Sequence, residues 1–91
     1  MKALPILIVE DDRDLREALC DTLSLAGYET LSAADGSSAL AVLENRQVGL
    51  VVTDVQMHPM DGHALLREIK ATSPYVPVML MTAYGMIDKA V

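Results

Sequence analysis

The sequence Val48-Gly49-Leu50-Val51-Val52-Thr53-Asp54 decides the fold. Five of the six residues before Asp54 are apolar or glycine, a pattern typical of a strand that is buried on both faces. A loop follows and ends in the turn pair Asp61-Gly62. Open α/β sheets place their functional groups where buried strands end and loops begin. We therefore expect Asp54 to lie in a functional site at the tip of a central strand.

A second apolar run also ends in acidic residues. Pro5-Ile6-Leu7-Ile8-Val9 leads directly into Glu10-Asp11-Asp12. Apolar runs alternate with segments of helical periodicity along the rest of the chain. We expect strands over residues 4–9, 29–33, 48–54 and 77–82. The helices between them are expected to begin at Asp12 or Asp14, at Asp35 and at Asp61, and to end at Gly27, near Asn45 and before Ser73, respectively. A last helix is expected to start within 86–91.

Alternating strands and helices predict an α/β fold with a parallel sheet and helices on both faces, because right-handed crossovers return each strand in parallel. The carboxyl ends of the strands then share one edge. Glu10, Asp11, Asp12, Asp54 and Thr82 are all expected at this edge. If the first and third strands are neighbours, about 4.8 Å apart, their acids lie within reach of one ion.

Composition limits the classes of function. Ninety-one residues form one small domain, and 52% hydrophobic residues suffice for a core. The net charge of −6 argues against binding of nucleic acid or an anionic membrane. The single Cys20 excludes an internal disulfide and fits a reducing compartment. The apolar run near the N-terminus is too short for a signal peptide or a membrane span, so we expect a soluble cytoplasmic protein.

Crowded carboxylates repel one another, by about 1 kcal/mol per pair in water at about 4 Å and more in a less polar medium. A native fold tolerates this repulsion if one acid is protonated, if the side chains splay into water, or if a cation lies between them. An all-oxygen site with few protein ligands suits Mg²⁺, which completes its shell with water and phosphate oxygens. Asp54 could then act as a nucleophile that forms an aspartyl phosphate, and the Thr82 hydroxyl could donate to the new phosphoryl oxygens.

Simpler roles for the same residues stay open. Asp12 or Asp14 alone is better explained as a helix cap than as a metal ligand. Glu10 could be only a solvated neighbour, and Thr82 an ordinary strand-end residue. His58 and His63 are expected at the surface, and no cysteine or second histidine at ligand spacing supports a zinc site.

Four blocks in order resemble the receiver domain of two-component response regulators. They are Ile6-Leu7-Ile8-Val9-Glu10-Asp11-Asp12, Val51-Val52-Thr53-Asp54-Val55-Gln56-Met57, Met60-Asp61-Gly62 and Val78-Met79-Leu80-Met81-Thr82-Ala83. The stretch from Met81 to Val91 is similar, more narrowly, to receivers of the nitrogen-regulatory type in sigma-54 activators. The resemblance runs the whole length of the chain and implies a flavodoxin-like sheet with the strand order 2-1-3-4.

The resemblance also implies roles for single residues. Asp54 would be the phosphoacceptor for a phosphoryl group from a sensor histidine kinase. Asp11, Asp12 and Asp54, with the backbone carbonyl of Gln56, would hold Mg²⁺. Thr82 would be the switch hydroxyl. The chain would be a signalling module, not an enzyme with turnover on an external substrate, and output domains for transcription control would follow in a longer protein.

Two departures from the family pattern stand out. The family usually has a proline four residues after the phosphoacceptor and a small residue next, where this chain has His58 and Pro59. Pro59 fixes its own φ and restricts His58 to extended conformations, so the loop could take another path. The fifth parallel strand, its lysine, the switch aromatic residue and the fifth helix cannot be assigned within residues 1–91. We therefore expect a receiver domain truncated before the fifth strand.

Three alternatives remain. The chain could be a receiver fragment that keeps the acidic site without switching. A Mg²⁺-dependent aspartyl phosphatase resembling the haloacid dehalogenases would have an acid at the position of Gln56. A flavodoxin-like nucleotide binder would have a glycine- or hydroxyl-rich loop where Glu10-Asp11-Asp12-Arg13 stands. Finally, the sequence predicts a free edge along residues 78–81 and bare helix faces, including part of 15–26. We therefore expect a homo-oligomer that forms through this strand or its neighbouring helix, or else a longer chain of which these residues are a part.

Overall fold

A computed structural model describes residues 3–82 and 85–88 of the chain. Strands and helices alternate up to residue 82, as the sequence predicts. The elements are β1 (Ile6–Val9), α1 (Arg13–Leu25), β2 (Thr30–Ala33), α2 (Gly36–Asn45), β3 (Leu50–Asp54), α3 (Gly62–Thr72), β4 (Val78–Thr82) and β5 (Gly85–Asp88).

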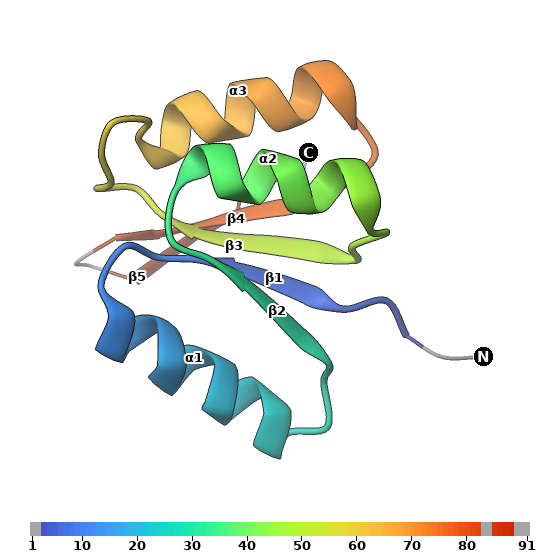
Figure 1. Cartoon of the computed structure of the whole chain (residues 1–91), viewed down its shortest axis with the longest axis vertical. Coiled ribbons are helices and arrows are strands. Elements are labelled where there is room, and N and C mark those ends of the chain that lie inside the picture. The colour runs from blue at the N-terminus through green and yellow to red at the C-terminus, as the bar shows by residue number, and fades with distance from the viewer. Residues whose placement is uncertain (1–2, 83–84, 89–91) are drawn as a thin grey trace.

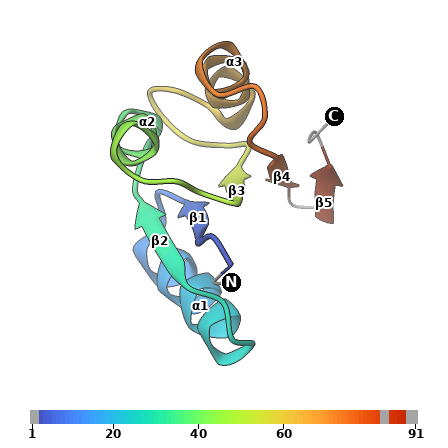
Figure 2. The same cartoon turned by 90° about the vertical axis from the view of Figure 1, so that its right-hand side faces the viewer.

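The sheet has the order β2-β1-β3-β4-β5, and its first four strands are parallel (Figures 1 and 2). The expected flavodoxin-like order 2-1-3-4 is therefore confirmed. Helices α2 and α3 cover one face of the sheet, and α1 lies on the other (Figure 1). All four parallel strands point their carboxyl ends to the same edge, where the acidic residues were expected.

Alternating residues of the strands divide the core into two parts, because successive side chains point to opposite faces of a sheet. On the α2 and α3 side, the strand residues pack against Leu65 and Ile69, which are fully buried. On the α1 side, Ile6, Ile8 and Val52 form a smaller cluster. All four residues of β1 are buried, which explains why its sequence shows no polar alternation.

Each helix in the described part of the chain begins at an aspartate whose side chain accepts a backbone N–H. Asp12 accepts from Leu15 at 3.1 Å, Asp35 from Ser38 at 2.8 Å, and Asp61 from Ala64 at 2.8 Å. These bonds satisfy N–H groups that have no partner within the helix. The predicted caps Asp35 and Asp61 are thus confirmed, and the first helix is capped by Asp12 and not by Asp14.

Residues 85–88 form a strand where the sequence predicted a helix to start at residue 86, and the rest of that predicted segment, 89–91, lies outside the described residues. β5 pairs antiparallel with β4, from Met79↔Asp88 to Thr82↔Gly85. The unpaired N–H and C=O groups of an edge strand offer a template for pairing, and here the chain itself occupies the outer edge of β4. The expectation of a free edge along 78–81 is therefore wrong. Self-association stays a prediction, without this edge as its support.

The α1 face of the sheet is only partly covered, as expected. Helix α1 has no buried residue, and Leu15 is 45% exposed. A groove of about 260 Å³ opens between α1 and the sheet. Its lining is apolar apart from one threonine and comprises Ile6, Ile8, Leu19, Thr22, Leu23, Leu50, Val52, Met79 and Met81.

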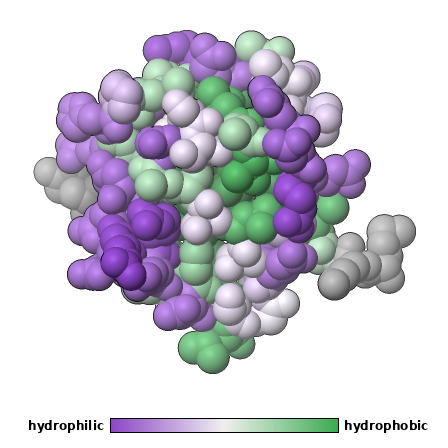
Figure 3. Space-filling view, viewed as in Figure 1, coloured by the Kyte–Doolittle hydropathy of each residue, from purple (hydrophilic) through white to green (hydrophobic). Residues whose placement is uncertain are grey.

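Figure 3, which takes the view of Figure 1 with both helix layers in sight, shows an apolar area near the middle of the molecule and hydrophilic residues around it. The C-terminal halves of α2 and α3 form a groove of about 360 Å³, lined by Leu40, Leu43, Glu44, Glu68, Thr72 and Ser73. Across the described ranges 3–82 and 85–88, no helix is both long and apolar enough to cross a membrane.

Candidate functional site

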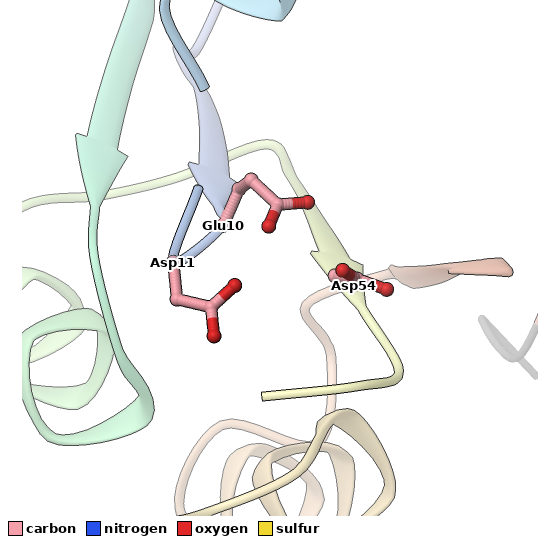
Figure 4. A group of neighbouring side chains, drawn as sticks. All are labelled: Glu10, Asp11 and Asp54. Carbon is pink, nitrogen blue, oxygen red and sulfur yellow. The ribbon is translucent and has the colours of Figure 1, made fainter. Parts of the chain in front are cut away.

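Three carboxylates meet where β1 and β3 end. Val9 of β1 pairs with Thr53 of β3, so the residues that follow, Glu10 and Asp54, lie side by side at the end of the sheet. Asp11 is next in the chain. One carboxylate oxygen from each of these three residues lies within 4.8 Å of the others, and Figure 4 shows the three side chains at the two strand ends. The acids expected from two separate strand tips therefore form one cluster.

Glu10 is the most buried member of this cluster. It is only 1% exposed, and its Oε1 atom is buried without a hydrogen-bond partner. Its Oε2 atom accepts a hydrogen bond from Asp12 N at 3.1 Å. Burial raises the pKa of Glu10 to about 7, with smaller contributions in the same direction from Asp11 and Asp54 and an opposing one from the Asp12 N–H. The interpretation of Glu10 as a solvated neighbour is therefore wrong.

Asp54 is held at the last position of β3. Its Oδ1 atom accepts a hydrogen bond from Gln56 N at 3.2 Å. Val55 N donates to the carbonyl of Met81 at 3.0 Å, which ties the start of the following loop to β4. The Asp54 side chain and the main chain that follows it are thus both held by hydrogen bonds.

Thr82 borders the same space as Asp54. Asp54 pairs with Met81 across β3 and β4, and Thr82 is the next residue. A cavity of about 360 Å³ is lined by Glu10, Leu15, Asp54, Gln56, Met81 and Thr82. The predicted phosphoacceptor and the predicted switch hydroxyl therefore open onto one cavity at the carboxyl edge of the sheet.

The side chain of Asp12, which the sequence suggested as a metal ligand, is not part of this carboxylate cluster. Its Oδ1 atom caps α1 by accepting from Leu15 N, and the three-carboxylate group in the described part of the chain contains Glu10 instead. The sequence placed Glu10 at this edge of the sheet but gave Asp12, and not Glu10, as a metal ligand. The register of the two parallel strands explains the difference, because the residue directly after β1 lies beside Asp54.

The donor set fits a hard divalent cation. All of its atoms are oxygens, and the buried Oε1 of Glu10 lacks a partner that a cation, or a water bound to it, could supply. Mg²⁺ prefers carboxylate and carbonyl oxygens and keeps several waters. Gln56, two residues beyond Asp54, lines the same cavity and carries a further backbone oxygen. His58 and His63 are both exposed, as expected.

The loop after Asp54 is packed against the body of the protein. Met57 is 1% exposed, and Thr53 Oγ1 lies 3.9 Å from its sulfur. The His58–Pro59 peptide bond is cis. Gly62, the first residue of α3, donates its N–H to the carbonyl of Val55 at 2.9 Å. The loop therefore returns to the residue next to Asp54 before α3 begins.

Comparisons with known sequences agree with this architecture. A family model described as the response regulator receiver domain matches residues 6–91. The response regulator protein FleR of Pseudomonas aeruginosa is 52% identical over 89 residues, which cover 98% of this chain and 19% of FleR. The C4-dicarboxylate transport transcriptional regulatory protein DctD of Rhizobium meliloti is 45% identical over 92 residues, covering 100% of this chain and 20% of DctD. This chain thus spans about a fifth of the length of these relatives.

Solved structures give the same result for the fold. The response regulator protein TrrA of Thermotoga maritima, in complex with Mg²⁺–BeF, superposes with a TM-score of 0.85 at 32% identity, over 90% of this chain and 71% of that chain. The chemotaxis response regulator CheY4 of Vibrio cholerae gives a TM-score of 0.82 at 30% identity, over 88% of this chain and 68% of that chain. Because the family model matches nearly every residue, this chain belongs to the response regulator receiver domains.

Proposed function

We propose that this chain is the phosphoacceptor receiver of a two-component response regulator. Asp54 takes a phosphoryl group from a histidine of a sensor kinase, with Mg²⁺ in the acidic cluster. The domain signals and does not turn over an external substrate. By its resemblance to receivers of sigma-54 activators, it controls a transcription activator in the cytoplasm through output domains of a longer protein.

The observation that carries this proposal is the place of Asp54. Its carboxylate ends a central strand, borders a cavity of about 360 Å³ and lies beside two further carboxylates. The Gln56 N–H holds Oδ1, which limits rotation of the carboxylate. An oriented carboxylate can attack phosphorus: a bond from the Asp54 oxygen to phosphorus forms, and the bond from phosphorus to the histidine nitrogen breaks.

The residues that would hold Mg²⁺ are Glu10, Asp11, Asp54 and the carbonyl of Gln56. This set keeps Asp11, Asp54 and Gln56 from the sequence prediction and puts Glu10 in the place of Asp12, whose side chain caps α1. A bound Mg²⁺ would offset the charge of the incoming phosphoryl oxygens. TrrA, a relative by fold, was solved as a complex with Mg²⁺–BeF, which supports a cation in this kind of site.

Thr82 is the proposed switch residue. It lines the cavity that Asp54 borders, at the end of β4. Its hydroxyl would donate a hydrogen bond to an oxygen of the transferred phosphoryl group, and β4 would move with it. Thr82 responds to the product and does not take part in the attack.

A labelling experiment tests the proposal. The protein is incubated with a small phosphodonor and Mg²⁺, and the mass of the intact chain is measured. We expect one added phosphoryl group on the wild type and none on Asp54→Asn. Asp35→Asn is the matched control, because it also removes one carboxylate, and asparagine caps a helix as well as aspartate does. Labelling of Asp54→Asn at the wild-type level would refute the assignment.

A further inference from the structure

Two helices of this protein begin with the same pair of residues. Asp35-Gly36 starts α2, and Asp61-Gly62 starts α3. In each pair the aspartate is the N-cap, and the glycine is the buried first residue of the helix. Neither glycine has a positive φ, since Gly27 is the one described glycine that does. The backbone conformation therefore requires glycine at neither position.

The surroundings of the two glycines differ. A Cβ atom added to Gly36 would meet the side chain of Met60, with the sulfur at 2.6 Å. A methionine side chain is flexible and can move aside. A Cβ atom added to Gly62 would overlap the backbone oxygen of Asp54 and come within 2.9 Å of the Val55 Cα atom. Only at Gly62 is the obstacle the main chain itself.

The backbone segment that Gly62 contacts carries the proposed phosphoacceptor, Asp54. Gly62 N–H donates to the Val55 carbonyl at 2.9 Å, and Gln56 N–H donates to Asp54 Oδ1 at 3.2 Å. The first turn of α3 thus rests on the segment from Asp54 to Gln56, which supplies both the nucleophile and the proposed carbonyl ligand. A side chain at residue 62 must displace either the helix or this segment.

We infer that Gly62 is a positioning residue for the phosphoacceptor site. It lets the first turn of α3 contact the backbone of Asp54 and so fixes the Asp54 carboxylate relative to Glu10 and Asp11. This inference rests on the proposed function, because the positioned groups are those that would bind Mg²⁺ and accept the phosphoryl group. Sequence reasoning had given the Asp61-Gly62 pair only a turn and a cap.

The test compares Gly62→Ala with Gly36→Ala. Each variant adds one methyl group at the first residue of a helix after an aspartate cap, so effects on helix formation are matched. Mg²⁺ binding is measured by amide chemical shifts and by calorimetry, and phosphoryl uptake is followed by mass. We expect Gly62→Ala to weaken Mg²⁺ binding by about tenfold or more, as loss of a supporting contact around metal ligands does. Gly36→Ala should bind Mg²⁺ like the wild type.

If Gly62 had only a structural role, Gly62→Ala would be less stable than the wild type, but the folded variant would bind Mg²⁺ with the same dissociation constant. That result would overturn the inference. If Gly62→Ala unfolds in ordinary buffer, it is measured at low temperature in sucrose, which favours the compact state. A chain that stays unfolded there would assign Gly62 to folding alone and also overturn the inference. Failure of the wild type to bind Mg²⁺ or take up phosphoryl would instead refute the proposed function.

Discussion

Replacement of Glu10 by glutamine should remove a pH dependence of folding stability. Glu10 is 1% exposed, and burial raises its pKa from 4.5 to about 7. Between these two values the folded protein binds more protons than the unfolded chain. The free energy of unfolding therefore falls as the pH rises through this window and levels off above about pH 7. Glutamine has nearly the same size and does not titrate.

The size of the effect follows from the rise of the pKa. A change from 4.5 to about 7 corresponds to an upper limit of about 3 kcal/mol. Water at the exposed Asp11 screens the cluster, so we expect a loss of about 1–2 kcal/mol in the wild type. In Glu10→Gln, Oε1 of the amide can still accept the Asp12 N–H, and the amide N–H groups can donate to Asp11 or Asp54. Its stability should change less over the same range.

Urea unfolding followed by circular dichroism, in buffer with EDTA at about pH 5 and about pH 8, measures this difference. Glu17→Gln is the matched control. It removes the same charge from an exposed side chain, which pairs with Arg13 at 3.3 Å on the surface. Glu17→Gln should follow the wild type. Equal pH dependence in the wild type and Glu10→Gln would refute the account of Glu10 as a buried, destabilised carboxylate. Added Mg²⁺ should stabilise the wild type more at the higher pH.

Four other variants test the assignment of roles in and around the site. Asp11→Ala should weaken Mg²⁺ binding about tenfold or more. Asp12→Ala should instead destabilise α1 by about 1 kcal/mol and leave Mg²⁺ binding near the wild-type value. Mg²⁺ titrations followed by amide chemical shifts show which of the two residues is a ligand. Thr82→Ala should still take up a phosphoryl group but lose the shift changes in β4 that accompany uptake, and a complete block of uptake would move Thr82 into the reaction itself. Asp61→Ala should lower the free energy of unfolding by about 1 kcal/mol because Ala64 N loses its acceptor; an unchanged urea midpoint would contradict the cap.

Local signals in the sequence predicted most of the fold. The aspartate caps depend on bonds between residues three apart, such as Asp35 with Ser38 at 2.8 Å, and such patterns are visible in the sequence. The central strands were visible as apolar runs because helices lie on both faces of the sheet. Asp54 and Asp11 were placed correctly at strand ends, since the carboxyl edge of a parallel sheet follows from the topology.

Nonlocal contacts explain what the sequence could not show. The burial of Glu10 depends on the register that sets Val9 opposite Thr53, and periodicity does not determine register between strands. The Arg16 guanidinium also donates to the Glu10 carbonyl at 2.8 Å and holds α1 near this position. β5 forms because the edge of β4 offers hydrogen-bonding groups to it. A short stretch such as 85–88 has little preference of its own, so its partner decides its structure.

Met81 joins the candidate site to the open face of the sheet. It lines the cavity at Asp54 and also the apolar groove beside α1. Its carbonyl accepts from Val55 N at 3.0 Å, so the main chain after Asp54 is tied to it directly. On the opposite face, Val78 and Leu80 are fully buried and leave little room for movement. If Thr82 moves toward a phosphoryl group on Asp54 as proposed, we expect β4 to be displaced on the side of Met81 and the apolar groove, and not on the tightly packed side of Val78 and Leu80.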